Sequence, residues 1–467
     1  MPEFAPDPSG ASSEPAKQAR SPFGAVLCLV LLAVVAGVYI RYARSGIDWE
    51  FLQTKHYWAA DQWYYGGYAG QYFETPQGYR ALITEGLTNY TNLFALGETV
   101  GPGQALHPVQ GFPGTERLAT PLLLSVWLRL PGETADVWHA FWQLNVLLWV
   151  VSVVLAYRAA ALYFDDEASP WFAAILMALY PALTVTFGAI KQQSLGSVYL
   201  LLGIVIFEGP LRARGRLAAV AALAAYFFLG QFADGGWCFL AAFLVLRSLW
   251  LPGAERWRSL AGIFAALALS LAWFSWLGHA YHLPSAARSR GFSLTVMGKE
   301  SVLWLLAWIS GKDVGGLWFF NYPGTDFFTT LWPLLCRGFL LVHGPLLVLA
   351  VAGLVLDRRS RMFTFLIVPM LLVGQMGVVA SGWVYHYGYL SFPAGVMALL
   401  AASSVLGSLV GRPSLTSRVV AVALATCACW CFVDLKRQAG IYYGGDPSAF
   451  TRQVEVHFGD DHGSATY

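Results

Sequence analysis

Carboxylates, aromatic side chains and glycines alternate at high density between residues 46 and 74. Asp48 and Asp61 carry carboxylates, which can accept a proton from an attacking hydroxyl group or hold a divalent cation. The aromatic side chains nearby can stack on sugar rings or prenyl chains; they are Trp63, Tyr64, Tyr65 and Tyr72. The alternative is an amphipathic segment at a membrane interface, where tryptophan and tyrosine are enriched.

Four further polar residues stand beside apolar stretches. Arg117 precedes the apolar residues 118–130, where an arginine can clamp a phosphate with two hydrogen bonds or simply anchor the stretch at an interface. Lys191 is the only charge in a tight apolar hairpin, and a charge in that setting is a candidate for function. Asp234 lies in the next hairpin, where it is either functional or the N-cap of the following helix. His386 can relay protons or serve a structural role.

The composition indicates what kind of fold must position these residues. Of 467 residues, 57% are hydrophobic and 12% are charged, whereas a soluble domain has about 25% charged residues. Runs of ~17–25 apolar residues are long enough to cross a bilayer as helices. The net charge of +2 gives no indication of nucleic-acid binding. The sequence contains neither a Walker loop nor a His-Glu-x-x-His site, which argues against an ATP-driven pump and a zinc protease.

The apolar pattern predicts an all-α polytopic membrane protein with about eleven transmembrane helices. We expect these helices near residues 23–42, 135–157, 170–189, 194–207, 217–232, 237–251, 260–277, 331–356, 362–380, 389–409 and 419–433. Residues 118–130 are too short for a comfortable span, at ~20 Å against a ~30 Å core, and contain Pro121.

The basic clusters set the expected orientation. If residues 118–130 form a helix that returns to its own side, every cluster between the spans falls on one face, at residues 158, 212–216, 247–258, 358–361 and 412–418. The positive-inside rule makes that face cytoplasmic. Residues 1–22 are then a disordered cytoplasmic N-terminus. The outer side receives a long, helical first loop (43–134), a second large loop (278–330) and the tail (434–467).

A carboxylate just outside the first span, followed by a long outer loop with surface helices, resembles the membrane-embedded GT-C glycosyltransferases. Residues 68–73, Tyr-Ala-Gly-Gln-Tyr-Phe, are similar to the Tyr-Asp-Gly-Gln-Phe/Tyr-Tyr run of a bacterial GT-C-like group. Residues 117–122, Arg-Leu-Ala-Thr-Pro-Leu, resemble the Arg-x-Leu-x-Pro-Leu stretch that follows in that group. The resemblance covers about residues 44–250.

The resemblance implies an enzyme of the bacterial inner membrane. It would transfer a sugar from a polyprenyl-phosphate donor to an acceptor glycan, lipid or protein on the outer face, often with a divalent cation such as Mg or Mn. Asp48 would be the base, with Asp61 as its alternate, and Arg117 and Lys191 would bind the donor phosphate. The remaining substrate-binding candidates are Trp63, Tyr64, Tyr65, Gln71, Tyr72, Asp234 and His386.

The sequence departs from that group at three places. Ala69 replaces its Asp, Lys191-Gln192 replaces an Arg-Asp pair, and residues 232–234 replace an Arg-Glu pair. A catalytically silent accessory subunit that keeps the scaffold is therefore the alternative. A transporter or lipid flippase is less favoured, because the charges lie at the outer rim and the sequence shows no paired halves.

Overall fold

The computed structural model describes residues 22–45, 123, 137–180, 193–210, 215–230, 236–280, 332–381, 387–412 and 414–433. Of these residues, 90% are helical and none lies in a strand. The all-helical fold expected from the sequence is therefore confirmed for the described part of the chain.

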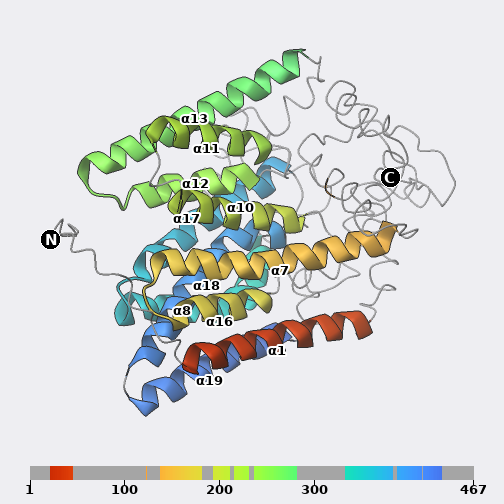
Figure 1. Cartoon of the computed structure of the whole chain (residues 1–467), viewed down its shortest axis with the longest axis vertical. Coiled ribbons are helices and arrows are strands. Elements are labelled where there is room, and N and C mark those ends of the chain that lie inside the picture. The colour runs from red at the N-terminus through yellow and green to blue at the C-terminus, as the bar shows by residue number, and fades with distance from the viewer. Residues whose placement is uncertain are drawn as a thin grey trace.

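Eleven helices are described, and each lies where the sequence predicts a span (Figure 1). They are α1 (Pro22–Ser45), α7 (Val137–Tyr163), α8 (Ala168–Ala178), α10 (Gln193–Glu208), α11 (Arg216–Gly230), α12 (Gly236–Ser248), α13 (Gly253–Ala280), α16 (Trp332–Leu356), α17 (Arg361–Ser381), α18 (Tyr387–Gly411) and α19 (Leu415–Val433).

One helix is shorter than the span expected over residues 170–189. α8 ends at Ala178, and its cap residue is Leu179. The next residues are Tyr180 and Pro181; a proline disfavours the helical conformation in the residue before it and cannot donate a backbone hydrogen bond. The indole Nε1 of Trp149 donates to the Ala178 carbonyl oxygen at 3.2 Å, which satisfies one of the free carbonyls at the helix end.

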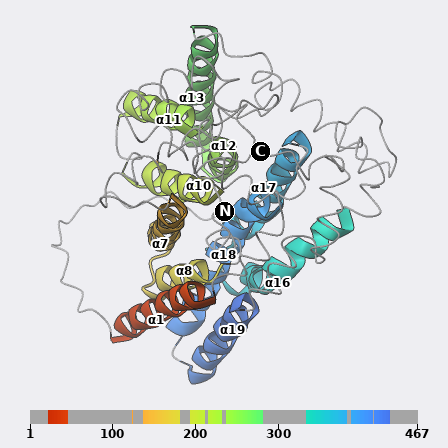
Figure 2. The same ribbon diagram turned by 90° about the vertical axis from the view of Figure 1, so that its right-hand side faces the viewer.

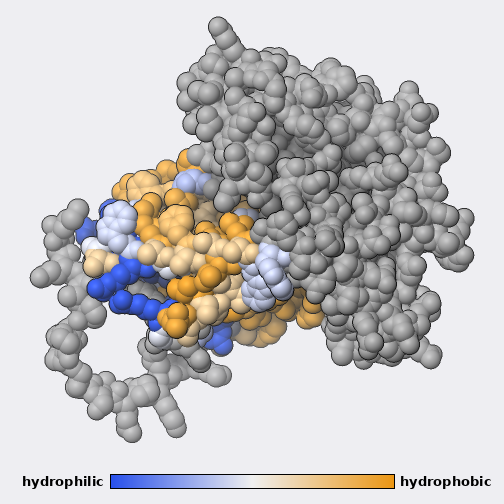
Figure 3. Space-filling model, turned by 90° about the horizontal axis from the view of Figure 1, so that it is seen from above, coloured by the Kyte–Doolittle hydropathy of each residue, from blue (hydrophilic) through white to orange (hydrophobic). Residues whose placement is uncertain are grey.

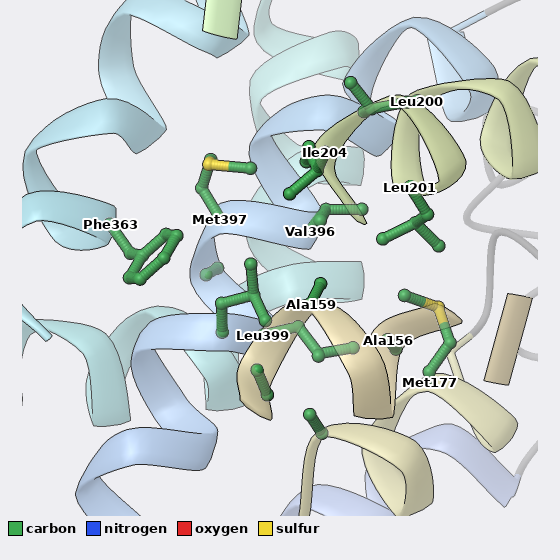
Figure 4. Close-up of a cluster of buried hydrophobic side chains, with 14 of the residues drawn as sticks. Ala156, Ala159, Met177, Leu200, Leu201, Ile204, Phe363, Val396, Met397 and Leu399 are labelled. Carbon is green, nitrogen blue, oxygen red and sulfur yellow. The ribbon is translucent and has the colours of Figure 1, made fainter. Parts of the chain in front are cut away.

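α18 lies at the centre of the larger group of helices and packs most extensively against α17, α16 and α8. The core around it includes side chains of α7, α8, α10, α17 and α18, which Figure 4 labels, and further side chains of α16 and α12. The fully buried members are mostly aliphatic, and Phe363 fills the space between α17 and α18. This packing fixes the helices that precede and follow the predicted outer loops.

A second group is formed by α10, α11, α12 and α13, whose closest pair is α11 with α13. It joins the larger group where α10 packs on α7 and α12 packs on α17. Figure 2 shows this group on the opposite side of the molecule from α1 and α19.

Three described helices are long and apolar enough to cross a membrane, over Phe23–Ile40, Val146–Tyr163 and Phe392–Gly411. Shorter apolar helices accompany them. In Figure 3 the hydrophobic surface forms a band across the described helices, and hydrophilic residues gather at one end of that band.

Candidate functional site

The three connections that the structure describes throughout, between α7 and α8, α12 and α13, and α16 and α17, lie together at one end of the bundle. The α7–α8 loop (164–167) meets the α16–α17 loop (357–360) through an ion pair, in which Arg359 Nη1 lies 3.4 Å from Asp166 Oδ2. The α12–α13 loop (249–252) joins them, because the Trp250 ring stacks on Phe365 near the start of α17, with centroids 5.7 Å apart. We call this the short-loop end.

Other helix termini meet at the same end. A Cβ atom added to Gly24 would overlap the Glu167 carboxylate, so the first turn of α1 touches the α7–α8 loop. A Cβ atom added to Gly209 would lie 3.5 Å from Leu162, which places the end of α10 beside the end of α7. The last turns of α10 and α12 are joined by an ion pair of 2.8 Å between Glu208 and Arg247.

The opposite helix ends flank the residues selected from the sequence. α1 and α7 flank residues 46–136, while α8 and α10 flank Lys191. Asp234 lies between α11 and α12, and His386 lies between α17 and α18. Because successive described helices along the chain alternate in direction, all of these flanking ends face away from the short-loop end.

The candidate residues themselves lie outside the described residues, so their mutual geometry stays a prediction. They are Asp48, Asp61, Trp63, Tyr64, Tyr65, Gln71, Tyr72, Arg117, Lys191, Asp234 and His386. The expected returning helix at 118–130 also lies there, apart from Leu123. The divalent cation implied by the resemblance is likewise untested.

A buried polar cluster, not anticipated from the sequence, ties the short-loop end together. Asp357 is only 7% exposed. One of its carboxylate oxygens accepts a short hydrogen bond from the Ser404 hydroxyl of α18. The other accepts the backbone N–H of Arg359 at 3.0 Å and lies 3.5 Å from the guanidinium of that residue. The carboxylate is thus held by two separate elements.

Arg359 extends the cluster to a third element. Its guanidinium contacts Asp166 and also donates to the Ser408 hydroxyl at 3.2 Å. Asp166 in turn accepts the backbone N–H and the hydroxyl of Ser169, both at 2.7 Å, at the start of α8. Since the carboxylates and the guanidinium are all engaged within the protein, this arrangement clamps the helices together and presents no free nucleophile or base.

A sequence signal for this cluster does exist. Asp166 and Ser169 are three residues apart at a helix start, and Asp357 and Ser360 repeat that spacing. Short polar side chains at such spacing mark helix N-termini. In the sequence, Arg359 is simply part of a basic cluster that indicates orientation. Nothing near it in the sequence indicates that Ser404 of α18 lies at the same place.

The sequence matches no protein-family model and no curated protein.

Proposed function

We propose that the chain is an integral membrane glycosyltransferase of GT-C type, which transfers a sugar from a polyprenyl-phosphate donor to an acceptor on the extracytoplasmic face. One observation carries the proposal. The helix ends that flank every candidate residue face away from the short-loop end, where Arg358 and Arg359 lie in one loop and further arginines lie on the adjoining helix ends. An outer active site requires that separation.

Charge and hydropathy support the membrane placement. The short-loop end carries Arg247, Arg256, Arg258, Arg358 and Arg361, and the positive-inside rule makes that end cytoplasmic. On the face shown in Figure 3, hydrophobic residues form a band across the described helices. The N-terminus is then cytoplasmic and the tail extracytoplasmic, in the inner membrane of a bacterium.

The proposed chemistry is a displacement at the sugar C1. Asp48 takes the proton of the acceptor hydroxyl while the acceptor oxygen forms its bond to C1. The bond between C1 and the phosphate oxygen breaks, and polyprenyl phosphate leaves with the electron pair. Arg117 and Lys191 stabilise the charge that develops on the departing phosphate. Aromatic residues of the first outer loop line the sugar and prenyl sites.

Asp48→Asn tests this chemistry, because the amide keeps the shape of the carboxylate but cannot accept the proton. We expect sugar transfer from a labelled polyprenyl-phosphate sugar to fall ~10²–10⁴-fold, the usual contribution of a positioned base. Asp165→Asn is the matched control; this exposed carboxylate lies at the short-loop end, and its variant should keep full activity. If Asp61→Asn is inactive and Asp48→Asn is active, the base is Asp61.

Arg117→Ala separates donor binding from proton transfer. Removing a phosphate clamp should raise the KM for the donor more than it lowers kcat. An unchanged KM for the donor would show that Arg117 does not bind the donor phosphate. The assignment of the base would be unaffected.

Ala69 supports a second candidate function, an accessory subunit that keeps the scaffold without the chemistry. The related run has a carboxylate at this position, and alanine can neither accept a proton nor bind a cation. Two results together would replace the enzymatic function with the accessory one. No donor would give sugar transfer, and neither Asp48→Asn nor Asp61→Asn would alter complex assembly or the level of lipid-linked sugars.

Cysteine labelling tests the orientation. Single cysteines at Gly215 and Gly445, in a background whose six native cysteines are replaced by alanine, should react with an impermeant reagent from opposite sides of sealed vesicles. Labelling of both positions from the same side would refute the topology.

A further inference from the structure

The starts of α11 and α13 form one continuous surface. A Cβ atom added to Gly262 of α13 would lie 3.4 Å from the Val220 side chain of α11. Farther along, the rings of Phe228 and Trp273 stack with centroids 4.3 Å apart. Both contacts advance in the same direction along the chain, so the two helices run parallel and begin at the same end of the bundle.

Arginines and bulky apolar side chains are exposed together on this surface. Arg216 and Arg258 each lie one helical turn before the Val220–Gly262 contact, so they stand side by side on adjacent helices. Their chain neighbours are highly exposed: Leu217 at 85% and Trp257 at 71%. We call these four residues the headgroup patch.

The charges around the patch leave it positive. Arg256 is adjacent, with its Nε donating to the Leu251 carbonyl oxygen at 3.1 Å. Glu255 contributes the one opposing charge in the first turn of α13. With three arginines and one carboxylate, the surface attracts anions. Its exposed tryptophan and leucine favour contact with an apolar neighbour.

The length of α13 places the patch at the edge of a bilayer. Trp257 and Trp276 are both exposed, and at ~1.5 Å per residue they lie about 28 Å apart along the helix. The hydrocarbon core of a bilayer is ~30 Å thick, and tryptophan is enriched at its two borders. Between them Phe264 and Leu269 are also exposed, as lipid-facing side chains should be.

We propose that the headgroup patch is a binding site for anionic phospholipid in the cytoplasmic leaflet. Arg216 and Arg258 bind the headgroup phosphate from two helices, while Trp257 and Leu217 contact the glycerol and upper acyl region. The proposal rests on the membrane placement proposed above, but it is independent of sugar transfer.

The test uses the purified full-length protein in detergent, titrated with short-chain phosphatidylglycerol or phosphatidylcholine. The wild type should bind phosphatidylglycerol more tightly. Each arginine near a membrane surface contributes about 1 kcal/mol, so the double variant Arg216→Gln/Arg258→Gln should bind phosphatidylglycerol about thirtyfold more weakly. Its phosphatidylcholine affinity should not change. If the double variant does not fold, Arg258→Gln alone should lose about fivefold.

Arg412→Gln/Arg418→Gln is the matched control, because it removes two exposed arginines at the α18–α19 connection at the end of α18. It should keep the phosphatidylglycerol affinity of the wild type. Equal losses in both double variants, or no loss in either, would overturn the site. Flotation with neutral phosphatidylcholine vesicles reports membrane placement separately: protein that does not float contradicts the proposed function as well.

Discussion

α1 and α18 are both long apolar helices, yet they occupy opposite environments. In α1, 11% of the Phe23–Ile40 window is buried within the protein, whereas 89% of the Phe392–Gly411 window of α18 is buried. α1 is nevertheless the more hydrophobic of the two. A higher hydropathy therefore does not mean that a helix is more deeply buried within the protein.

Side-chain size explains the difference. The buried face of α18 includes Ala398, Ala401 and Ala402, all with no exposed surface. Small residues let helix backbones approach closely, and such close packing is one source of attraction between apolar helices. α1 instead exposes Val26, Leu29 and other large aliphatic side chains, which are as well solvated by acyl chains as by protein.

The largest expected effect comes from removing a large side chain from each helix. Leu399→Ala in α18 should lower the free energy of unfolding by about 2–5 kcal/mol, because it leaves a cavity in a packed core. Leu29→Ala in α1 removes the same atoms from an exposed position and should have a much smaller effect. Thermal midpoints in one detergent would measure both. Equal losses would show that burial does not distinguish the two helices.

A smaller effect is expected from adding a side chain. A Cβ atom at Gly407 would lie 2.5 Å from Asp166 Oδ1 and 2.9 Å from the Ser169 backbone nitrogen. Gly407→Val should therefore cost about 1–3 kcal/mol, as overpacking typically does. Gly37→Val is the control, since nothing lies within 4 Å of a Cβ there. A destabilised Gly37 variant would mean that the exposed face of α1 around Gly37 has a packing partner too.

The smallest expected effect comes from the polar contact at the end of α18. Ser404→Ala removes the hydrogen bond to the buried Asp357 carboxylate and should cost about 1 kcal/mol. A double-mutant cycle with Asp357→Ala would isolate the interaction between the two side chains. Ser403→Ala is the control, because that buried hydroxyl donates within α18, to the Leu400 carbonyl oxygen at 2.8 Å. Strict additivity in the cycle would show that the contact does not contribute to stability.

Local pattern is sufficient to place the eleven described helices but not to separate the exposed ones from the buried ones. A run such as α18 is apolar on every side, so only its distant partners α8, α16 and α17 reveal its buried position. Pro181 indicates the early end of α8, although the apolar run continues past it.

The candidate site could be predicted only as a set of residue types. The sequence around Asp48 shows which residues are its neighbours along the chain. It does not determine whether Arg117 or Lys191 lies close to that carboxylate in space. Such distances depend on tertiary contacts between segments far apart in sequence. The Asp357–Ser404 contact, across 47 residues, illustrates the same dependence within the described part.

The short length of α8 has a consequence for how the protein is made. Every residue of α8 except Trp171 is buried, and part of that enclosure comes from α18, which begins more than two hundred residues later. At 5–20 residues per second, synthesis reaches α18 about 10–40 s after α8 has left the ribosome. During that interval the nascent chain holds a short helix whose described packing partners made so far are α1 and α7. Until α18 has been made, the buried surface of α8 therefore needs cover from the earlier part of the chain or from another protein.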